Sequence, residues 1–165
     1  MVKNINPIRE TDAQSISLAA RLIADERYGA LGVLEATTGV PLVSRIACAH
    51  DVAFGLFFAA SDLSMHSKCL LENSTCSLLL GEPGKGDGLA HPRITLIGTA
   101  SRMQNDDPER ARYRSAFLKI HPKAELYIDF ADFGFYPLIL KRAYLNGGFG
   151  KAYHLEKADL EKLFS

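Results

Sequence analysis

The chain of 165 residues has no tryptophan, only three cysteines and no net charge. Its 19 Lys and Arg residues balance 19 Asp and Glu residues, so the overall charge gives no reason to expect a nucleic acid or an anionic membrane as partner. No apolar run approaches the roughly 18 residues of a membrane-spanning helix, and the N-terminus lacks the apolar core of a signal peptide. These absences predict a cytoplasmic protein.

Residues that bind metals or act as nucleophiles are sparse and scattered. Cys48, Cys69 and Cys76 have no CxxC spacing, which indicates reduced, buried thiols rather than a disulfide framework or a zinc site. The five histidines form no HxH, HxxxH or HExxH group, so we predict no metal site. There is also no GxSxG elbow and no marked pair of carboxylates, and any chemistry is therefore better assigned to a cofactor.

The composition that is present fits one globular domain. Hydrophobic residues make up 47% of the chain and charged residues 23%. A chain of this size buries roughly 70% of the surface that its unfolded state exposes, so it needs no metal or disulfide to fold. We expect a single domain over residues 1–165, with residues 1–10 as a flexible arm.

Periodicity and turn signals predict an α+β fold that is mainly β. Helices are expected at 11–28, 62–73, 107–120, 122–130 and 157–164. Strands are expected at 30–37, 40–49, 53–60, 75–81, 93–103, 133–145 and 151–155. About six or seven strands with few helices indicate a closed or half-closed antiparallel barrel. The Gly-rich segment 81–88 does not have the GxxxxGK[ST] spacing, so we interpret it as a connection between strands.

The most informative segment is Ser61-Asp-Leu-Ser-Met-His-Ser-Lys68, where an apolar strand gives way to a helix. If the helix begins near Asp62, then Ser61, Ser64 and Lys68 follow an i, i+3, i+7 spacing along one stripe, with Ser67 beside it. Hydroxyls, an ammonium group and free backbone N–H groups together suit a phosphate. A capped surface helix with a solvated polar face is the alternative.

Arg45 lies in a neighbouring strand of otherwise apolar residues, where an isolated buried charge would be costly. We therefore expect an acidic or phosphate partner for it. Ser44 and Arg45 point to opposite faces of a strand, so their side chains do not reach the same ligand unless a bulge intervenes. His66 is either an ordinary polar helix residue or a ligand contact, and His154 is a conjectural haem ligand.

Six motifs occur in a recognisable order: Ser61-Asp-Leu-Ser-Met-His-Ser-Lys68, Cys76-Ser-Leu-Leu-Leu80, Arg93-Ile-Thr-Leu-Ile-Gly98, His121-Pro-Lys-Ala124, Asp132-Phe133 and Gly147-Gly-Phe-Gly-Lys-Ala152. Together, over roughly residues 12–155, they resemble the haem-utilisation (HugZ-like) branch of the pyridoxamine 5'-phosphate oxidase-like FMN-binding split barrels.

The resemblance implies a six-stranded antiparallel split β-barrel that forms a homodimer with FMN sites at the interface. It implies an FMN-binding flavoprotein, a flavin-dependent oxidoreductase whose substrate the sequence does not reveal. Lys68 stands where many relatives have Arg, which keeps the charge but loses the bidentate fork and implies looser phosphate binding. The cofactor-binding residues that the resemblance implies are Ser44, Arg45, Ser61, Ser64, Ser67 and Lys68.

Two departures from the family limit this reading. A true pyridoxamine-phosphate oxidase ends in a Trp-containing segment with an Arg-and-His substrate motif, which this chain lacks, so vitamin synthesis is disfavoured. The haem-degrading relatives have a longer C-terminal region than this sequence. Two alternatives therefore stay open: a haem-binding or haem-utilisation protein, and a flavin carrier without catalytic activity.

Overall fold

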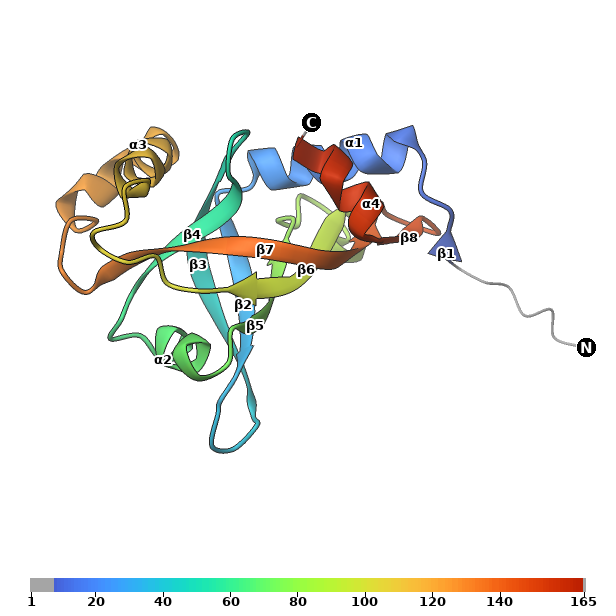
Figure 1. The fold of residues 1–165 in the computed structure, drawn as a ribbon. Helices are drawn as coiled ribbons and strands as arrows, with labels where there is room; N and C mark the ends of the chain where they lie inside the picture. The colour runs from blue at the N-terminus through green and yellow to red at the C-terminus, as the bar shows by residue number, and fades with distance from the viewer. Residues whose placement is uncertain (1–7, 165) are drawn as a thin grey trace, which may run out of the picture.

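Six antiparallel strands close into a barrel in the computed structural model, which describes residues 8–164 (Figure 1). The six are β2 (Tyr28–Leu34), β3 (Pro41–Asp51), β4 (Gly55–Ser61), β5 (Thr75–Leu80), β6 (Arg93–Ala100) and β7 (Phe133–Asn146). Their order around the barrel is β2-β3-β4-β7-β6-β5, and β5 pairs with β2 to close it. The predicted six-stranded antiparallel barrel is confirmed.

The long strand β7 joins the barrel to two further strands. On one edge, β4 pairs with the first part of β7, while β8 (Ala152–Leu155) pairs with its last part. On the other edge β6 pairs with β7, with a register shift between Ile97 and Gly98. β1 (Ile8–Arg9) runs parallel to β8. The predicted arm therefore ends in a paired strand, and its first seven residues lie outside the described chain.

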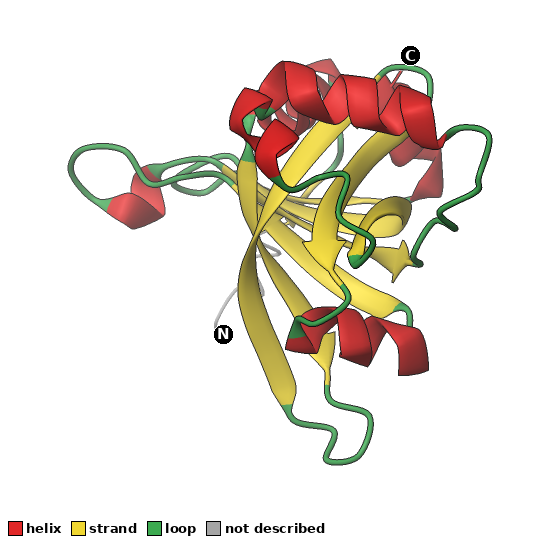
Figure 2. Ribbon diagram, turned by 90° about the vertical axis from the view of Figure 1, so that its left-hand side faces the viewer, coloured by secondary structure: helices red, strands yellow, loops and turns green. Residues whose placement is uncertain are grey.

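The helices lie at the ends and on one side of the barrel. α1 (Ala13–Asp25) lies across one end and α2 (Met65–Glu72) at the other (Figure 1). α3 (Arg110–Ile120) packs on the outer surface with a 3₁₀ turn at Pro122–Leu126 (Figure 2). The chain ends with α4 (Lys157–Leu160) and a 3₁₀ turn at Glu161–Phe164. Within residues 8–164, no helix is long and apolar enough to cross a membrane.

Two hydrophobic clusters hold these elements together. Inward-facing strand residues fill the barrel, where the rings of Phe58 and Tyr136 stack 5.0 Å apart. A second cluster lies outside, between α3 and the outward side chains of β3, β4 and β7. All three cysteines are free and buried, as predicted. Burial raises the pKa of the Cys48 thiol to about 12, so it is protonated at neutral pH.

Gly98 sits at the register shift between β6 and β7, where the two backbones approach closely. A Cβ at this position would lie 2.1 Å from the Ile139 carbonyl oxygen. We expect Gly98→Ala to lower the free energy of unfolding by about 1–3 kcal/mol, because the backbone of β7 must shift. Urea unfolding measures this, with Thr99→Ala on the same strand as control. Equal stability of Gly98→Ala and the wild type would contradict the assigned close approach.

Candidate functional site

A groove of about 300 Å³ opens on the outer surface where β3 and β4 meet the start of α2. We call it the serine groove. Its polar lining comes from Arg45, Ser61, Ser64 and His66, and its apolar wall includes Phe117, Tyr127 and Phe133. The groove therefore combines one guanidinium, two hydroxyls and one imidazole beside an aromatic wall.

The local fold leaves the start of α2 uncapped. Ser64 occupies the N-cap position, but its side chain makes no capping hydrogen bond. Instead the Ser64 hydroxyl donates to the Ser61 carbonyl oxygen over 2.7 Å. The N–H groups of a helix's first turn have no partner within the helix, and they carry the positive end of its dipole. The groove thus borders a helix start that can receive an anion.

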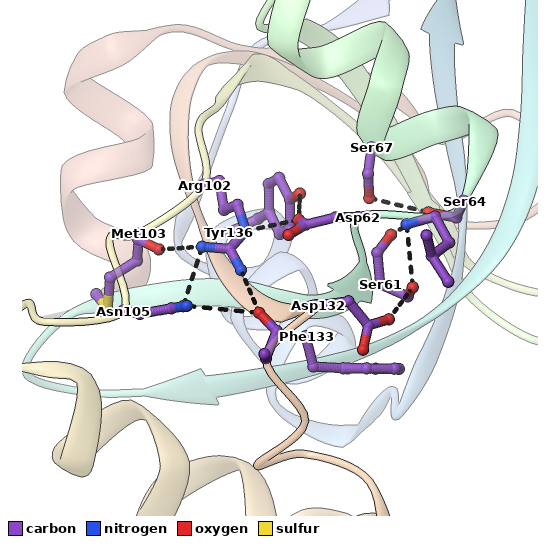
Figure 3. A network of polar contacts seen from close by, with 12 residues as sticks. Ser61, Asp62, Ser64, Ser67, Arg102, Met103, Asn105, Asp132, Phe133 and Tyr136 are labelled. Carbon is purple, nitrogen blue, oxygen red and sulfur yellow. Dashed lines mark hydrogen bonds and ion pairs between the residues drawn. The ribbon is translucent and has the colours of Figure 1, made fainter.

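Ser61 is fixed by the residue that precedes β7. Its hydroxyl donates to the Asp132 carboxylate over 2.5 Å and accepts from the Leu63 backbone N–H (Figure 3). The Asp62 backbone N–H also donates to the Asp132 carbonyl oxygen, over 2.7 Å. One residue therefore holds the end of β4 through both its side chain and its backbone.

His66 and Ser67 complete the polar group around Ser64. His66 Nε2 lies 3.0 Å from Ser64 Oγ, and Ser67 Oγ lies 2.9 Å from it (Figure 3 draws the serines). Ser67 is buried beneath the groove, whereas His66 is half-buried. Burial lowers the pKa of His66 below its usual value of 6.5. At neutral pH, the imidazole of the free protein is therefore uncharged.

The environment of Arg45 differs from the buried one that the sequence predicts. Its side chain is exposed on the outward face of β3 rather than buried, because that face is left uncovered at this position. Among residues 8–164, Arg45 has neither a hydrogen bond nor an ion pair. Arg45 also lines a second hollow of about 310 Å³, formed with Tyr28, Gly29, Ala30, Leu79, Gly81, Glu82 and Pro83. The guanidinium thus stands between two adjoining hollows.

Two of the predicted cofactor residues lie away from the groove. Ser44 faces the opposite side of β3 from Arg45, opposite Leu31 of β2, as strand alternation requires. Lys68 is exposed and lines another hollow with Glu35 and Glu72. The expected single stripe does not form, because α2 begins at Met65 and Ser61 still belongs to β4.

A polar network behind the groove was not predicted. Arg102 donates through Nε to Asp62 over 2.6 Å and through its other nitrogens to Met103, Asn105 and Ala131 (Figure 3). The Tyr136 hydroxyl lies 3.5 Å from the same Asp62 oxygen. These residues are far apart in the sequence, and no local spacing signals their contact. They fasten the loops after β4 and β6 to the segment before β7.

The other histidine proposed as a ligand lies elsewhere. His154 is exposed on β8, where its ring meets Tyr144 edge-on with centroids 4.7 Å apart. Tyr144 lies 11 residues along β7 from Phe133, which lines the groove, so a distance on the order of 30 Å separates them along the strand. In the described part of the chain, no group of three His, Cys, Asp or Glu residues could hold a metal ion.

Comparison with known proteins gives consistent relationships. Residues 10–162 match the protein family described as CREG, β-barrel. The chain is 42% identical over 98 residues to the non-canonical heme oxygenase HOZ, chloroplastic, of Arabidopsis thaliana, a match that covers 59% of this chain and 29% of HOZ. The chain therefore spans less than a third of the length of that relative.

Solved structures share the fold. A heme binding protein from Mycobacterium smegmatis superposes with a TM-score of 0.79 at 27% identity, over 90% of this chain and 60% of that one. A protein of the pyridoxinephosphate oxidase family from Clostridium acetobutylicum superposes with a TM-score of 0.69 at 14% identity, over 91% of this chain and 99% of that one. The split-barrel fold of the predicted superfamily is confirmed.

The Asp62–Arg102 pair should stabilise the site more than a surface pair does. The Arg102 side chain is 15% exposed, whereas in the Arg112–Glu109 pair the arginine is 58% exposed. We expect Arg102→Ala to lower the free energy of unfolding by about 1–3 kcal/mol, because Asp62 keeps only the Tyr136 hydroxyl at 3.5 Å and the Met103 carbonyl oxygen loses its side-chain donor. Arg112→Ala should change it by less than about 1 kcal/mol. Equal losses in urea unfolding would contradict this assignment.

Proposed function

This chain belongs to the CREG β-barrel family, and we propose that it is an FMN-binding flavoprotein whose serine groove holds the cofactor's phosphate. One observation carries the proposal: the exposed Arg45, which has no partner among residues 8–164, the hydroxyls of Ser61 and Ser64, and the uncapped start of α2 converge on one groove. A phosphate monoester accepts hydrogen bonds from the guanidinium and from the helix N–H groups. It also accepts from the hydroxyls of Ser61 and Ser64 once their hydrogens turn from Asp132 and the Ser61 carbonyl oxygen, to which they are donated in the free protein.

Arg45 supplies the charge and sets the direction of the cofactor. Its planar fork can make two parallel hydrogen bonds to a phosphate, which a lysine cannot. Because Arg45 also lines the neighbouring hollow, a molecule bound through its phosphate extends naturally into that hollow. The floor there includes Ala30, whose small side chain leaves room for a planar ring. We assign this second hollow to the isoalloxazine.

A second copy of the chain would cover the open side of the hollow that we assign to the isoalloxazine ring. Apart from Arg93 at the start of β6, the outward residues of β2, β5 and β6 carry no charge, and they belong to neither hydrophobic cluster; they include Ala30, Gly32, Ser77, Leu79, Thr95 and Ile97. Uncharged, partly apolar sheet faces of this kind suit an interface between identical subunits. Ala30 and Leu79 also line the second hollow, so a homodimer across this face would put the FMN sites at its edge.

The chain's own residues bind and orient the cofactor. When bound, FMN supplies the redox chemistry, and Arg45, Ser61 and Ser64 fix its phosphate. The aromatic wall of the groove excludes water from one side of the phosphate site. We assign the protein to the flavin-dependent oxidoreductases of the cytoplasm. Reduction of the bound flavin by NADH or NADPH separates this assignment from a carrier that only stores FMN.

FMN titration followed by flavin fluorescence tests the phosphate site. Arg45→Ala removes a charged donor whose hydrogen bonds are worth about 1.5–3 kcal/mol, so Kd should rise about 10-fold to 100-fold. Lys68→Ala removes the same charge outside the groove and should change Kd less than about 3-fold. The reverse ranking would place the phosphate near Lys68, and a wild-type protein without FMN affinity would refute the function.

Haem is the second candidate, and the relatives favour it. The protein HOZ is named a heme oxygenase, and the Mycobacterium smegmatis protein is named a heme binding protein. In this alternative, Arg45 and the helix start would hold a propionate, and His66 is the histidine that lines the groove.

Haemin titration tests this second function. If His66 ligates the iron, a Soret shift should appear with the wild type, disappear in His66→Ala and persist in His154→Ala. A shift that depends on His154 would instead support the ligand conjectured from the sequence. No Soret shift with the wild-type protein would remove haem as a ligand.

A further inference from the structure

We propose that His66 makes the serine groove selective for dianionic phosphate monoesters, because the imidazole takes up a proton as the ligand binds. The inference rests on the proposed FMN site and names the group that recognises the ligand's charge. Three atoms determine this proton uptake: Ser64 Oγ and the two ring nitrogens of His66.

The hydrogen bonds of Ser64 determine which ring nitrogen carries the proton. Its hydroxyl has one hydrogen and lies 2.7 Å from the Ser61 carbonyl oxygen, which can only accept. The other acceptor for that hydrogen is Ser67 Oγ, 2.9 Å away. With the hydrogen donated to Ser61 or to Ser67, Ser64 Oγ accepts from His66 Nε2, 3.0 Å away. We therefore assign the neutral imidazole to the Nε2–H tautomer, in which Nδ1 carries the lone pair.

Nδ1 is the atom that a ligand must satisfy. Within residues 8–164, no hydrogen bond engages it. A phosphate oxygen is also only an acceptor, so it can bond to Nδ1 only after that nitrogen is protonated. Once protonated, the imidazolium donates from Nε2 to Ser64 and from Nδ1 to the phosphate, and every polar atom of the group has a partner.

The charged groups around His66 determine the pKa of its imidazole ring. Arg45 faces it across the groove from β3, Tyr127 from the 3₁₀ turn, and Asp132 acts through its hydrogen bond to Ser61. No other ionisable residue of β4 or α3 lines the groove. In the free protein, burial lowers the pKa of His66 below 6.5. A dianion beside it favours the charged ring and raises that pKa, whereas an uncharged ligand end does not.

The sign of the pH dependence follows from this difference. The pKa of His66 is higher in the complex than in the free protein, so binding takes up a proton. The added affinity is complete below the pKa of the free protein and is lost as the pH rises through the pKa of the complex. A phosphate monoester is mostly dianionic above about pH 6, so its own titration does not mask the effect at higher pH.

The experiment measures FMN affinity between pH 6.5 and 8.5, with calorimetry in two buffers of different ionisation enthalpy. The wild type should bind FMN with uptake of up to one proton, and its Kd should rise by up to about tenfold per pH unit. His66→Asn keeps a donor for Ser64 but cannot titrate, so its Kd should stay constant. Riboflavin, which lacks the phosphate, should show no dependence with the wild type.

The outcomes separate the two proposals. FMN binding that does not depend on pH, or a dependence that survives in both His66→Asn and His66→Gln, would overturn the role of His66 and leave the FMN site standing. Absence of FMN binding at every pH would overturn the site and this inference with it. Arg45→Ala serves as a matched control, because it should weaken binding while keeping the slope against pH.

Discussion

The arrangement of the site depends on the grip of Asp132 on the end of β4. The carboxylate accepts from Ser61, and the carbonyl oxygen accepts from the backbone of Asp62. Because Ser61 is held in this way, its carbonyl oxygen can accept a hydrogen bond from the Ser64 hydroxyl. That hydroxyl therefore does not cap the first turn of α2. A hydrogen bond across 71 residues of sequence thus decides that α2 begins without a side-chain cap.

The hydrogen bonds from Asp132 also hold in place two regions on either side of the loop after β4, the serine groove and the Arg102 network. Ser61 and Asp62 are consecutive residues, yet one lines the serine groove and the other pairs with Arg102 behind it. The groove keeps few charges of its own, whereas the network behind it is nearly saturated with hydrogen bonds. Rigid support therefore lies beneath a surface on which the guanidinium of Arg45 is available to a ligand, which is the arrangement that preorganised binding requires.

The fold could be predicted from the sequence because its signals are local. The Asp12 capping box starts α1, the turn at Gly39 joins β2 and β3, and alternating apolar residues mark the strands. The site was predictable only in part. The composition of the segment that includes Ser61 and Ser64 predicts its place in the site. The exposure of Arg45 depends on the uncovered outward face of β3, and the displacement of Lys68 depends on where α2 begins. The three-residue difference in that start follows from Asp132, which lies far along the chain.

Strand β7 is longer than its pairing with β4, and its last part extends beyond β4 to pair with β8. The pairing of β4 with its first part and of β6 along its other edge closes the ring, and neither involves β8. β8 pairs with a stretch of β7 that β4 does not reach, and β1 pairs with β8. The C-terminal elements therefore lie outside the circle of hydrogen-bonded strands that frames the groove, although Leu155, Leu160 and Leu163 pack into the core of the barrel. Their length and sequence can vary only where replacements keep that core covered.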